Sequence, residues 1–184
     1  MIQRFSFGHP FPTQSVVLSL PAESGPVPFL TPDGTGWQLT LSEQAAIYGL
    51  GEMPRGINKR GWHYVTDNTD ESHHGENRLS YYGAHNFLLI DGGAGRSVFG
   101  VFVDFPGKVF YDIGYTRHDR LTFRTEEPDY DLYILTGDSP NAVCTEFRKL
   151  IGHSYIPPKW AFGATQSRWS YMNEDEVREV VANY

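Results

Sequence analysis

Several side chains that could act in catalysis or bind a metal ion lie in one polar segment, residues 53–82. It contains the carboxylates of Asp70 and Glu76 and the adjacent histidines His73 and His74. Carboxylates can act as general acids and bases, and together with histidine they can hold a metal ion. Adjacent histidines, however, point in different directions on most backbones, and no second cluster at ligand spacing supports them. The sequence therefore favours a solvated loop, and we expect no metal site.

A glycine pair occurs in the segment Tyr-Gly-Leu-Gly-Glu at residues 48–52. A dinucleotide-binding loop needs a third glycine and a helix directly after it. Pro54 stands at the position of that glycine, so the pattern fails. We instead expect a tight turn between strands, in which Glu52 is structural.

Short apolar runs separated by turns predict β-strands up to about residue 136. Residues 37–41 alternate with period two after a Pro-Asp-Gly turn, and residues 87–90 and 98–103 flank a glycine-rich loop, as in a hairpin. Further runs at 109–113, 121–123 and 132–135 follow at a spacing of roughly ten residues, which is typical of a sandwich or barrel. Between the first runs and the hairpin, residues 53–82 lack β-branched runs and predict a long loop.

Long ordered loops usually carry function, whereas a disordered excursion is the alternative. The aromatic residues Trp62, Tyr64, Tyr81 and Tyr82 favour function for this loop.

A helix is expected after the strands. Ser139 is a plausible N-cap with Pro140 at the first helical position, and Gly152 supplies the end. The apolar face comprises Val143, Phe147 and Leu150. Cys144, the only cysteine, reads as a small buried apolar side chain on this helix and excludes an internal disulfide.

After the Ile-Pro-Pro link at 156–158, residues 160–165 predict a buried strand. Asn173 with Glu176 then predicts the start of a second helix through a capping box. Its apolar stripe comprises Val177, Val180, Val181 and Tyr184. A strand followed by a helix cannot bury its own apolar faces, so this end resembles the first β-α unit of something longer. A helix docked on the sandwich is the alternative.

The composition limits the classes of partner. Fifteen Lys and Arg against 22 Asp and Glu give a formal net charge of −7, which argues against nucleic-acid and anionic-membrane partners. No apolar run approaches the roughly 18 residues of a transmembrane helix, and no secretory signal precedes the first strand. These features favour a cytoplasmic protein.

Three groups of residues carry a family resemblance when taken together. The first is the segment at 48–52 followed by Gly-Ile-Asn-Lys-Arg-Gly at 56–61, and the second is Tyr-Gly-Ala-His-Asn-Phe at 82–87. The third runs from Ser154 to Gly163 and continues through Gln-Ser-Arg-Trp at 166–169. In order and spacing the chain resembles the α-glucosidases of glycoside hydrolase family 31. Relatives often have proline where Asn86 stands, which puts the local backbone in question.

The resemblance implies a mainly β chain in two parts. Residues 1–155 would form an antiparallel β-sandwich of the galactose-mutarotase-like type, with the long loop at 53–82 reaching the substrate. Residues 156–184 would form the first strand and helix of the catalytic (β/α)₈ barrel. A whole barrel needs about 250 residues, so the barrel here would be truncated.

The resemblance also implies a retaining mechanism, in which two carboxyl groups about 5–5.5 Å apart act as nucleophile and acid/base. The family's nucleophile lies in a Trp-x-Asp-Met-Asn-Glu motif on a later barrel strand. Residues 169–174 are a near match, but Tyr171 occupies the Asp position. We therefore expect no catalytic residue in this chain and both carboxylates beyond residue 184. No cofactor is implied.

Two residues match substrate-contacting positions of the family. Asp70 lies in the long loop, where a carboxylate can accept hydrogen bonds from sugar hydroxyls. Trp169 follows the first barrel strand, where an indole can form a wall of the sugar site. A solvated loop carboxylate is the alternative for Asp70, and a core aromatic is the alternative for Trp169.

The resulting hypothesis is the amino-terminal portion of an enzyme that hydrolyses terminal α-glucosidic bonds of small oligosaccharides. The alternative is a stand-alone sandwich module that binds carbohydrate or protein without catalysis. A sugar mutarotase is a weaker idea, which needs a His and a carboxylate positioned in a cleft. Exposed apolar residues of the barrel part, including Trp160 and Phe162, predict self-association.

Overall fold

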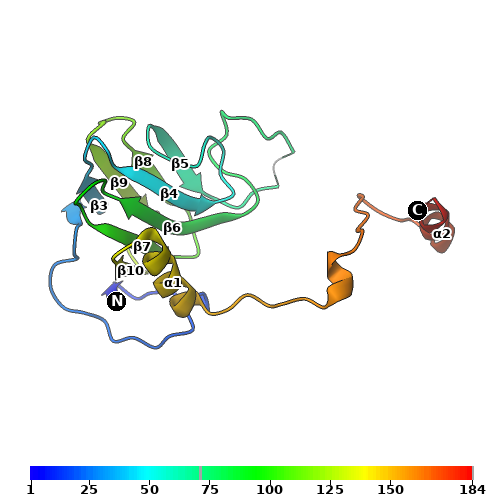
Figure 1. The fold of residues 1–184 in the computed structure, drawn as a ribbon, viewed down its shortest axis with the longest axis horizontal. Coiled ribbons are helices and arrows are strands. Elements are labelled where there is room, and N and C mark those ends of the chain that lie inside the picture. The colour runs from blue at the N-terminus through cyan, green and yellow to red at the C-terminus, as the bar shows by residue number, and fades with distance from the viewer. Residues whose placement is uncertain (71, 184) are drawn as a thin grey trace. The chain divides into compact units, whose positions relative to one another are not determined.

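The computed structural model describes residues 1–70 and 72–183. Its contacts divide the chain into two compact units, Met1–His153 and Ser154–Tyr184. The first unit is a β-sandwich of two antiparallel five-stranded sheets (Figure 1). Sheet A has the order β1 (Ile2–Phe7), β10 (Tyr130–Gly137), β7 (Val98–Asp104), β6 (Ala84–Asp91) and β4 (Ala46–Gly51). Sheet B has the order β2 (Thr31–Asp33), β3 (Gly36–Thr40), β9 (Arg120–Thr125), β8 (Val109–Ile113) and β5 (Trp62–Thr66). The predicted sandwich is confirmed.

Sheet A is buried on both faces. Leu132 and Ile134 of β10 belong to the core between the sheets, whereas Tyr133 and Leu135 belong to a second apolar cluster on the outer face. A strand that buries both faces needs no polar alternation. This explains why β10 and its neighbour β7 read as nearly continuous apolar runs.

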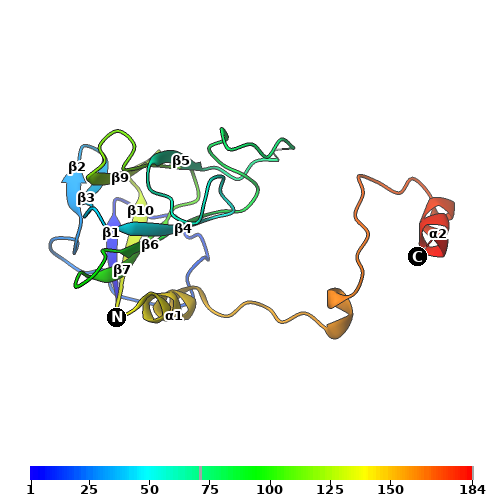
Figure 2. The ribbon, with the colours of Figure 1, turned by 45° about the horizontal axis from the view of Figure 1, so that its top comes forward.

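The second cluster is closed by helix α1 (Pro140–Ile151), which packs on β6, β7 and β10 (Figure 2). The predicted ends of this helix are confirmed. Ser139 Oγ accepts a hydrogen bond from the amide of Ala142, and Gly152 ends the helix at a φ of 84°. Phe147 stacks on Phe87 of β6 with ring centroids 3.9 Å apart. Cys144, in contrast, is exposed, because it lies beside rather than on the apolar face.

Strand β5 lies inside residues 53–82, so the prediction of one continuous loop is wrong for Trp62–Thr66. Tyr64 is fully buried and pairs with Tyr111 of β8. The strand was missed because polar His63 and exposed Trp62 interrupt the apolar alternation. The loop that remains, residues 67–83, connects sheet B to sheet A.

The first four residues of the Tyr-Gly-Leu-Gly-Glu segment belong to strand β4, and Glu52 directly follows it, so the segment is not the expected turn. Gly49, Leu50 and Gly51 all have positive φ, at 118°, 65° and 72°. The pairing of β4 with β6 shifts register between Gly49 and Gly51. The glycines therefore form a β-bulge, which requires left-handed backbone next to a neighbouring strand.

In the second unit, helix α2 (Glu174–Ala182) begins as predicted. The side chain of Asn173 accepts a hydrogen bond from the amide of Glu176 at 3.0 Å. Val181 is exposed, and the predicted stripe residue Tyr184 lies outside the described residues.

The buried strand predicted at 160–165 is not formed. Lys159–Phe162 is instead a 3₁₀ helix, and the Trp160 side chain is 82% exposed. An isolated strand would leave its amides and carbonyls unpaired, and the described part of this unit offers no second strand. None of the described helices has the length and apolar content needed to cross a bilayer.

Candidate functional site

A cleft of about 850 Å³ opens at one end of the sandwich in the first unit. It lies where β5 ends, β6 begins, and the β7–β8 connection passes. The bulge of β4 and the side chains of Phe147 and Ile151 from α1 complete its walls. The cleft is therefore built from both sheets and adjoins the loop at residues 67–83.

The cleft carries a cluster of charged groups. Asp67 directly follows β5 and Lys108 directly precedes β8, and Lys108 Nζ lies 2.9 Å from Asp67 Oδ2. This hydrogen bond and the negative charge of Asp67 raise the pKa of Lys108. Glu126 Oε2 accepts the Lys108 amide at 3.0 Å. The cleft thus presents two carboxylates beside one ammonium, an arrangement that can bind hydroxyl groups as acceptor and donor.

Asn86 joins the two sheets at the floor of the cleft. Thr66 of β5 donates its hydroxyl proton to Asn86 Oδ1, and Asn86 Nδ2 donates to the carbonyl of Phe105. The Thr66 hydroxyl also accepts the amide of Val109. Asn86 therefore has a definite structural role, and β6 continues through it.

Asp104 also lines the cleft and is buried at the end of β7. Thr13 donates its hydroxyl to Asp104 Oδ1 at 2.6 Å. The paired residue on β10 is Asp131, which forms an ion pair with Arg4 at 2.9 Å. Burial raises the pKa of Asp104 and the nearby Asp131 charge adds to this, while the Thr13 hydrogen bond opposes it. Charged Asp104 therefore costs folding free energy at neutral pH.

Asp112 of β8 is the opposite case. Burial alone would raise its pKa, but hydrogen bonds from Thr116, Tyr115 and His63 outweigh burial and lower it. His63 Nε2 lies 3.0 Å from Asp112 Oδ2, and the Tyr115 amide donates to Oδ1 at 2.9 Å. Charged Asp112 therefore stabilises the fold above its ordinary pKa.

These two carboxylates give opposite predictions for asparagine variants. We expect Asp104→Asn to raise the free energy of unfolding at pH 7 by on the order of 1 kcal/mol, because the amide oxygen still accepts from Thr13 without a buried charge. The gain should shrink as the pH falls through the raised pKa towards the ordinary value of 3.8, where parent Asp104 is protonated. Urea unfolding from pH 7 to pH 4 measures both effects.

Asp112→Asn is the matched control. It should lower the free energy of unfolding at pH 7, and the difference from the parent should vanish as the pH falls below the ordinary pKa and through the lowered one. Equal changes of the same sign in both variants would contradict the assignment of these two environments.

Neither residue predicted to contact substrate lies in the cleft lining. Asp70 is exposed in the loop between β5 and β6 and, among the described residues, makes no hydrogen bond or ion pair. Trp169 belongs to the second unit and is fully exposed, so it is not a core aromatic in the described part of that unit. No described group of three or more His, Cys, Asp or Glu side chains is placed to hold a metal ion.

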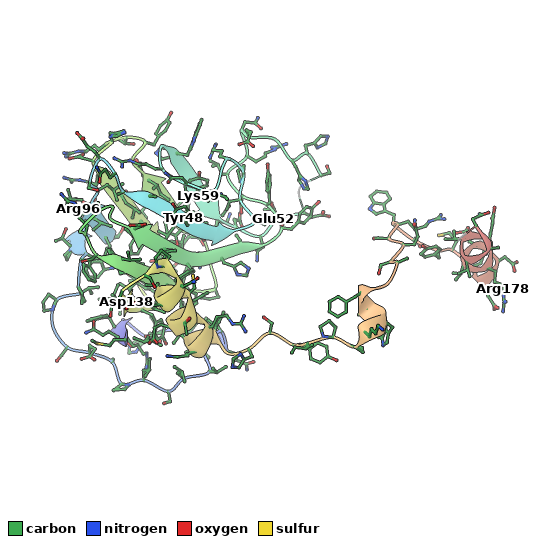
Figure 3. The ribbon with its side chains drawn as sticks, viewed as in Figure 1. Tyr48, Glu52, Lys59, Arg96, Asp138 and Arg178 are labelled. Atoms are coloured by element: carbon green, nitrogen blue, oxygen red, sulfur yellow. The ribbon has the colours of Figure 1, made fainter. Side chains whose placement is uncertain are left out.

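The residues that sequence analysis missed are Asp67, Lys108 and Glu126. Asp67 lies only three positions before Asp70, and the end of β5 would have been the signal, since side chains at strand ends line such clefts. Glu52, at the end of β4 (Figure 3), donates its amide to the carbonyl of Gly83 at 2.8 Å. This bond fixes the point where the loop returns to sheet A.

Comparison with known proteins places the chain in a family. Residues 21–112 match the model of the glycosyl hydrolase 31 N-terminal galactose mutarotase-like domain. The chain belongs to glycoside hydrolase family 31. Residues 154–184 match the family's TIM-barrel domain, which agrees with the predicted start of a barrel.

Curated relatives agree with this family. Alpha-glucosidase 2 of Bacillus thermoamyloliquefaciens is 34% identical over 146 residues, which is 78% of this chain and 18% of that protein. Alpha-xylosidase 1 of Arabidopsis thaliana is 30% identical over 79% of this chain and 16% of its own length. The chain thus spans less than a fifth of the length of these relatives.

Solved structures show the same sandwich. The family 31 dextranase of Flavobacterium johnsoniae, complexed with glucose, has a TM-score of 0.72 and 26% identity over 85% of this chain and 19% of that chain. The cycloalternan-degrading enzyme from Trueperella pyogenes has a TM-score of 0.65 and 20% identity over 80% of this chain and 22% of that one, and it shares the fold.

Proposed function

We propose that these 184 residues are the amino-terminal portion of a retaining hydrolase of terminal α-glucosidic bonds in small oligosaccharides. The portion shapes the substrate site and does not contain the catalytic carboxylates. The observation that carries the proposal is the charged cleft beside the loop at residues 67–83, in a chain whose relatives include α-glucosidases. A neutral sugar suits a cleft in which acceptors and a donor already lie side by side.

In this proposal the loop brings side chains to the sugar. Asp70 is exposed and accepts hydrogen bonds from sugar hydroxyls, and Asp67 and Lys108 line the cleft. Trp169 walls the sugar by apolar contact, for which its exposed indole is suited. Bond cleavage requires the two carboxyl groups of the retaining mechanism, which the proposal assigns to the polypeptide beyond residue 184.

Two measurements test the proposal. Reading the coding DNA past the codon for Tyr184 should give a frame that continues into a barrel with a Trp-x-Asp-Met-Asn-Glu stretch. Purified residues 1–184, incubated with maltose, should release glucose no faster than buffer. The proposal is contradicted if a stop codon directly follows the codon for Tyr184, or if residues 1–184 alone hydrolyse maltose at a measurable rate.

The longer polypeptide that the extended reading frame encodes tests the predicted activity directly. It should hydrolyse maltose and release glucose first as the α-anomer, which nuclear magnetic resonance detects before mutarotation. Asp70→Asn in that protein should raise KM and lower kcat/KM by about tenfold, through the loss of a charged acceptor. The control is Asp138→Asn, between β10 and the N-cap of α1 and outside the cleft lining, which should leave both constants unchanged.

A further inference from the structure

The outer face of sheet B is a second surface with ordered polar groups, apart from the cleft. In Figure 2 its strands β3, β9 and β5 lie on the side of the sandwich away from α1, which packs on sheet A. The strand register places two rows of side chains across this face, since directly paired residues share a face. The first row is Thr31, Gln38, Thr122, Asp112 and His63, and the second is Asp33, Gly36, Arg124, Phe110 and Val65.

A groove of about 400 Å³ is lined by part of these rows, and we call it the sheet B groove; the row residues in its lining are His63, Asp112, Thr122, Asp33, Arg124, Phe110 and Val65. Gly36 lies between Asp33 and Arg124 in the second row but is not part of the groove lining. A Cβ at Gly36 would lie 2.1 Å from the carbonyl oxygen of Phe123, so close strand approach requires glycine here. The volume of the groove is within the size range of small-molecule sites.

The groove combines apolar and polar groups. Val65 and Phe110 are half-buried on the strands, and Leu79 is exposed beside them. The guanidinium of Arg124 lies 4.1 Å from the centre of the Phe110 ring. Among the described residues no carboxylate pairs with Arg124, so its N–H donors face solvent.

The acceptors on the groove are fixed in position. Asp112 accepts the backbone amides of Tyr115 and Thr116 and contacts His63, so its carboxylate has little freedom left to lose. The Tyr115 ring is 58% exposed and lies 4.4 Å from the His63 ring. Fixed groups lower the entropy cost of binding a ligand.

The charges of the groove select the class of ligand. The carboxylates of Asp33 and Asp112 and the guanidinium of Arg124 lie in the groove lining, so the groove has no excess of arginine and lysine that would favour an anion. An apolar strip flanked by acceptors and planar N–H donors suits a ring with a C–H face and a rim of hydroxyls. A neutral pyranose has this chemistry, whereas an extended peptide needs an unpaired strand edge rather than a sheet face.

We propose that the sheet B groove binds one or two units of a neutral saccharide, at a site separate from the cleft. Arg124 donates to hydroxyls, Asp112 accepts from them, and the C–H face lies on Val65 and Phe110. The site does not depend on the proposed hydrolytic function, since it would hold a sugar whether or not the complete enzyme cleaves one.

The test is a titration of the ¹⁵N-labelled 184-residue chain with maltotriose, followed by amide chemical shifts. We expect millimolar, fast-exchange binding with shift changes at the two rows. Arg124→Ala should weaken this binding by roughly tenfold, and Thr122→Lys, which places a long side chain in the groove lining, should do the same. Because both residues are on the outer face, the spread of amide shifts should show that both variants fold.

Two controls separate this site from the cleft. Arg96→Ala removes a loop arginine outside the sheet B groove (Figure 3) and should leave the maltotriose affinity unchanged. Asp67→Asn changes the cleft and should also leave the maltotriose-induced amide shift changes at the two rows unchanged. The proposal would be overturned if maltotriose caused no amide shift changes, or changed only the amide shifts of the cleft. It would also be overturned if the amide shifts of the two rows changed when the protein concentration was raised without sugar, a result that would identify a second copy of the chain as the occupant.

Discussion

Gly51→Ala should lower the free energy of unfolding by more than about 3 kcal/mol and leave much of the chain unfolded at 37 °C. Gly51 has a φ of 72° at the end of the β4 bulge. A Cβ there would lie 2.2 Å from the carbonyl oxygen of Gly83 and 3.0 Å from the amide nitrogen of His85. Both are backbone atoms of the start of β6 and its approach, so relief requires the two chain segments to separate.

Gly95→Ala is the matched control. Gly95 also has a φ of 72°, but a Cβ there meets nothing within 4 Å. Its variant should therefore lose only the cost of left-handed backbone, about 1 kcal/mol. Urea unfolding of both variants gives the comparison, and equal losses would show that backbone conformation alone, rather than the close approach to Gly83, makes glycine necessary at Gly51.

The same close approach connects the bulge to the cleft. Gly49, Leu50 and Gly51 line the cleft, and the Glu52 amide bonds to Gly83 where the loop rejoins sheet A. In the folded fraction of a Gly51→Ala protein, the amide shifts should therefore change more at the loop and the cleft than at the sheet B groove. The glycine motif that helped to reveal the family thus has a steric role in placing the loop.

The sequence predicted elements well where local signals and burial agree. Strand β8 was predicted at Val109–Ile113, its bounds in the structure, because apolar side chains alternate there with half-buried ones. The ends of α1 were predicted from Ser139 and Gly152, whose capping chemistry is local. Such signals need no knowledge of distant partners.

Predictions failed where a distant partner decides the structure. Strand β5 exists because β8 pairs with it, although its own residues are largely polar or aromatic. Residues 160–165 have the composition of a buried strand, but residues 160–162 belong to a 3₁₀ helix and no strand of the described unit pairs with the segment. Cleft residues Asp67 and Lys108 come from segments 41 positions apart, so only the paired sheets bring them together.

The Gly-Ile-Asn-Lys-Arg-Gly segment at residues 56–61 gives the second large prediction, because its arginine joins three loops. Arg60 Nη1 donates to the carbonyls of Ser42, Glu43 and Ala45 at 2.7, 3.1 and 3.2 Å. Its Nη2 donates to the carbonyl of His118 at 2.8 Å. One guanidinium therefore ties the β3–β4 connection to the β8–β9 turn and to the segment that precedes β5.

Arg60→Met should lower the free energy of unfolding by about 3 kcal/mol, since it keeps the apolar stem but leaves these carbonyls without their charged donor. Arg60→Lys should recover only part of the loss. A lysine ammonium cannot donate to the carbonyls of the β3–β4 connection and of the β8–β9 turn at the same time, as the planar guanidinium does. Arg96→Met, at an exposed position in the β6–β7 loop, is the control and should change stability by less than about 0.5 kcal/mol. Urea unfolding orders the three variants, and an Arg60→Met protein as stable as Arg96→Met would mean that backbone pairing alone holds the three loops.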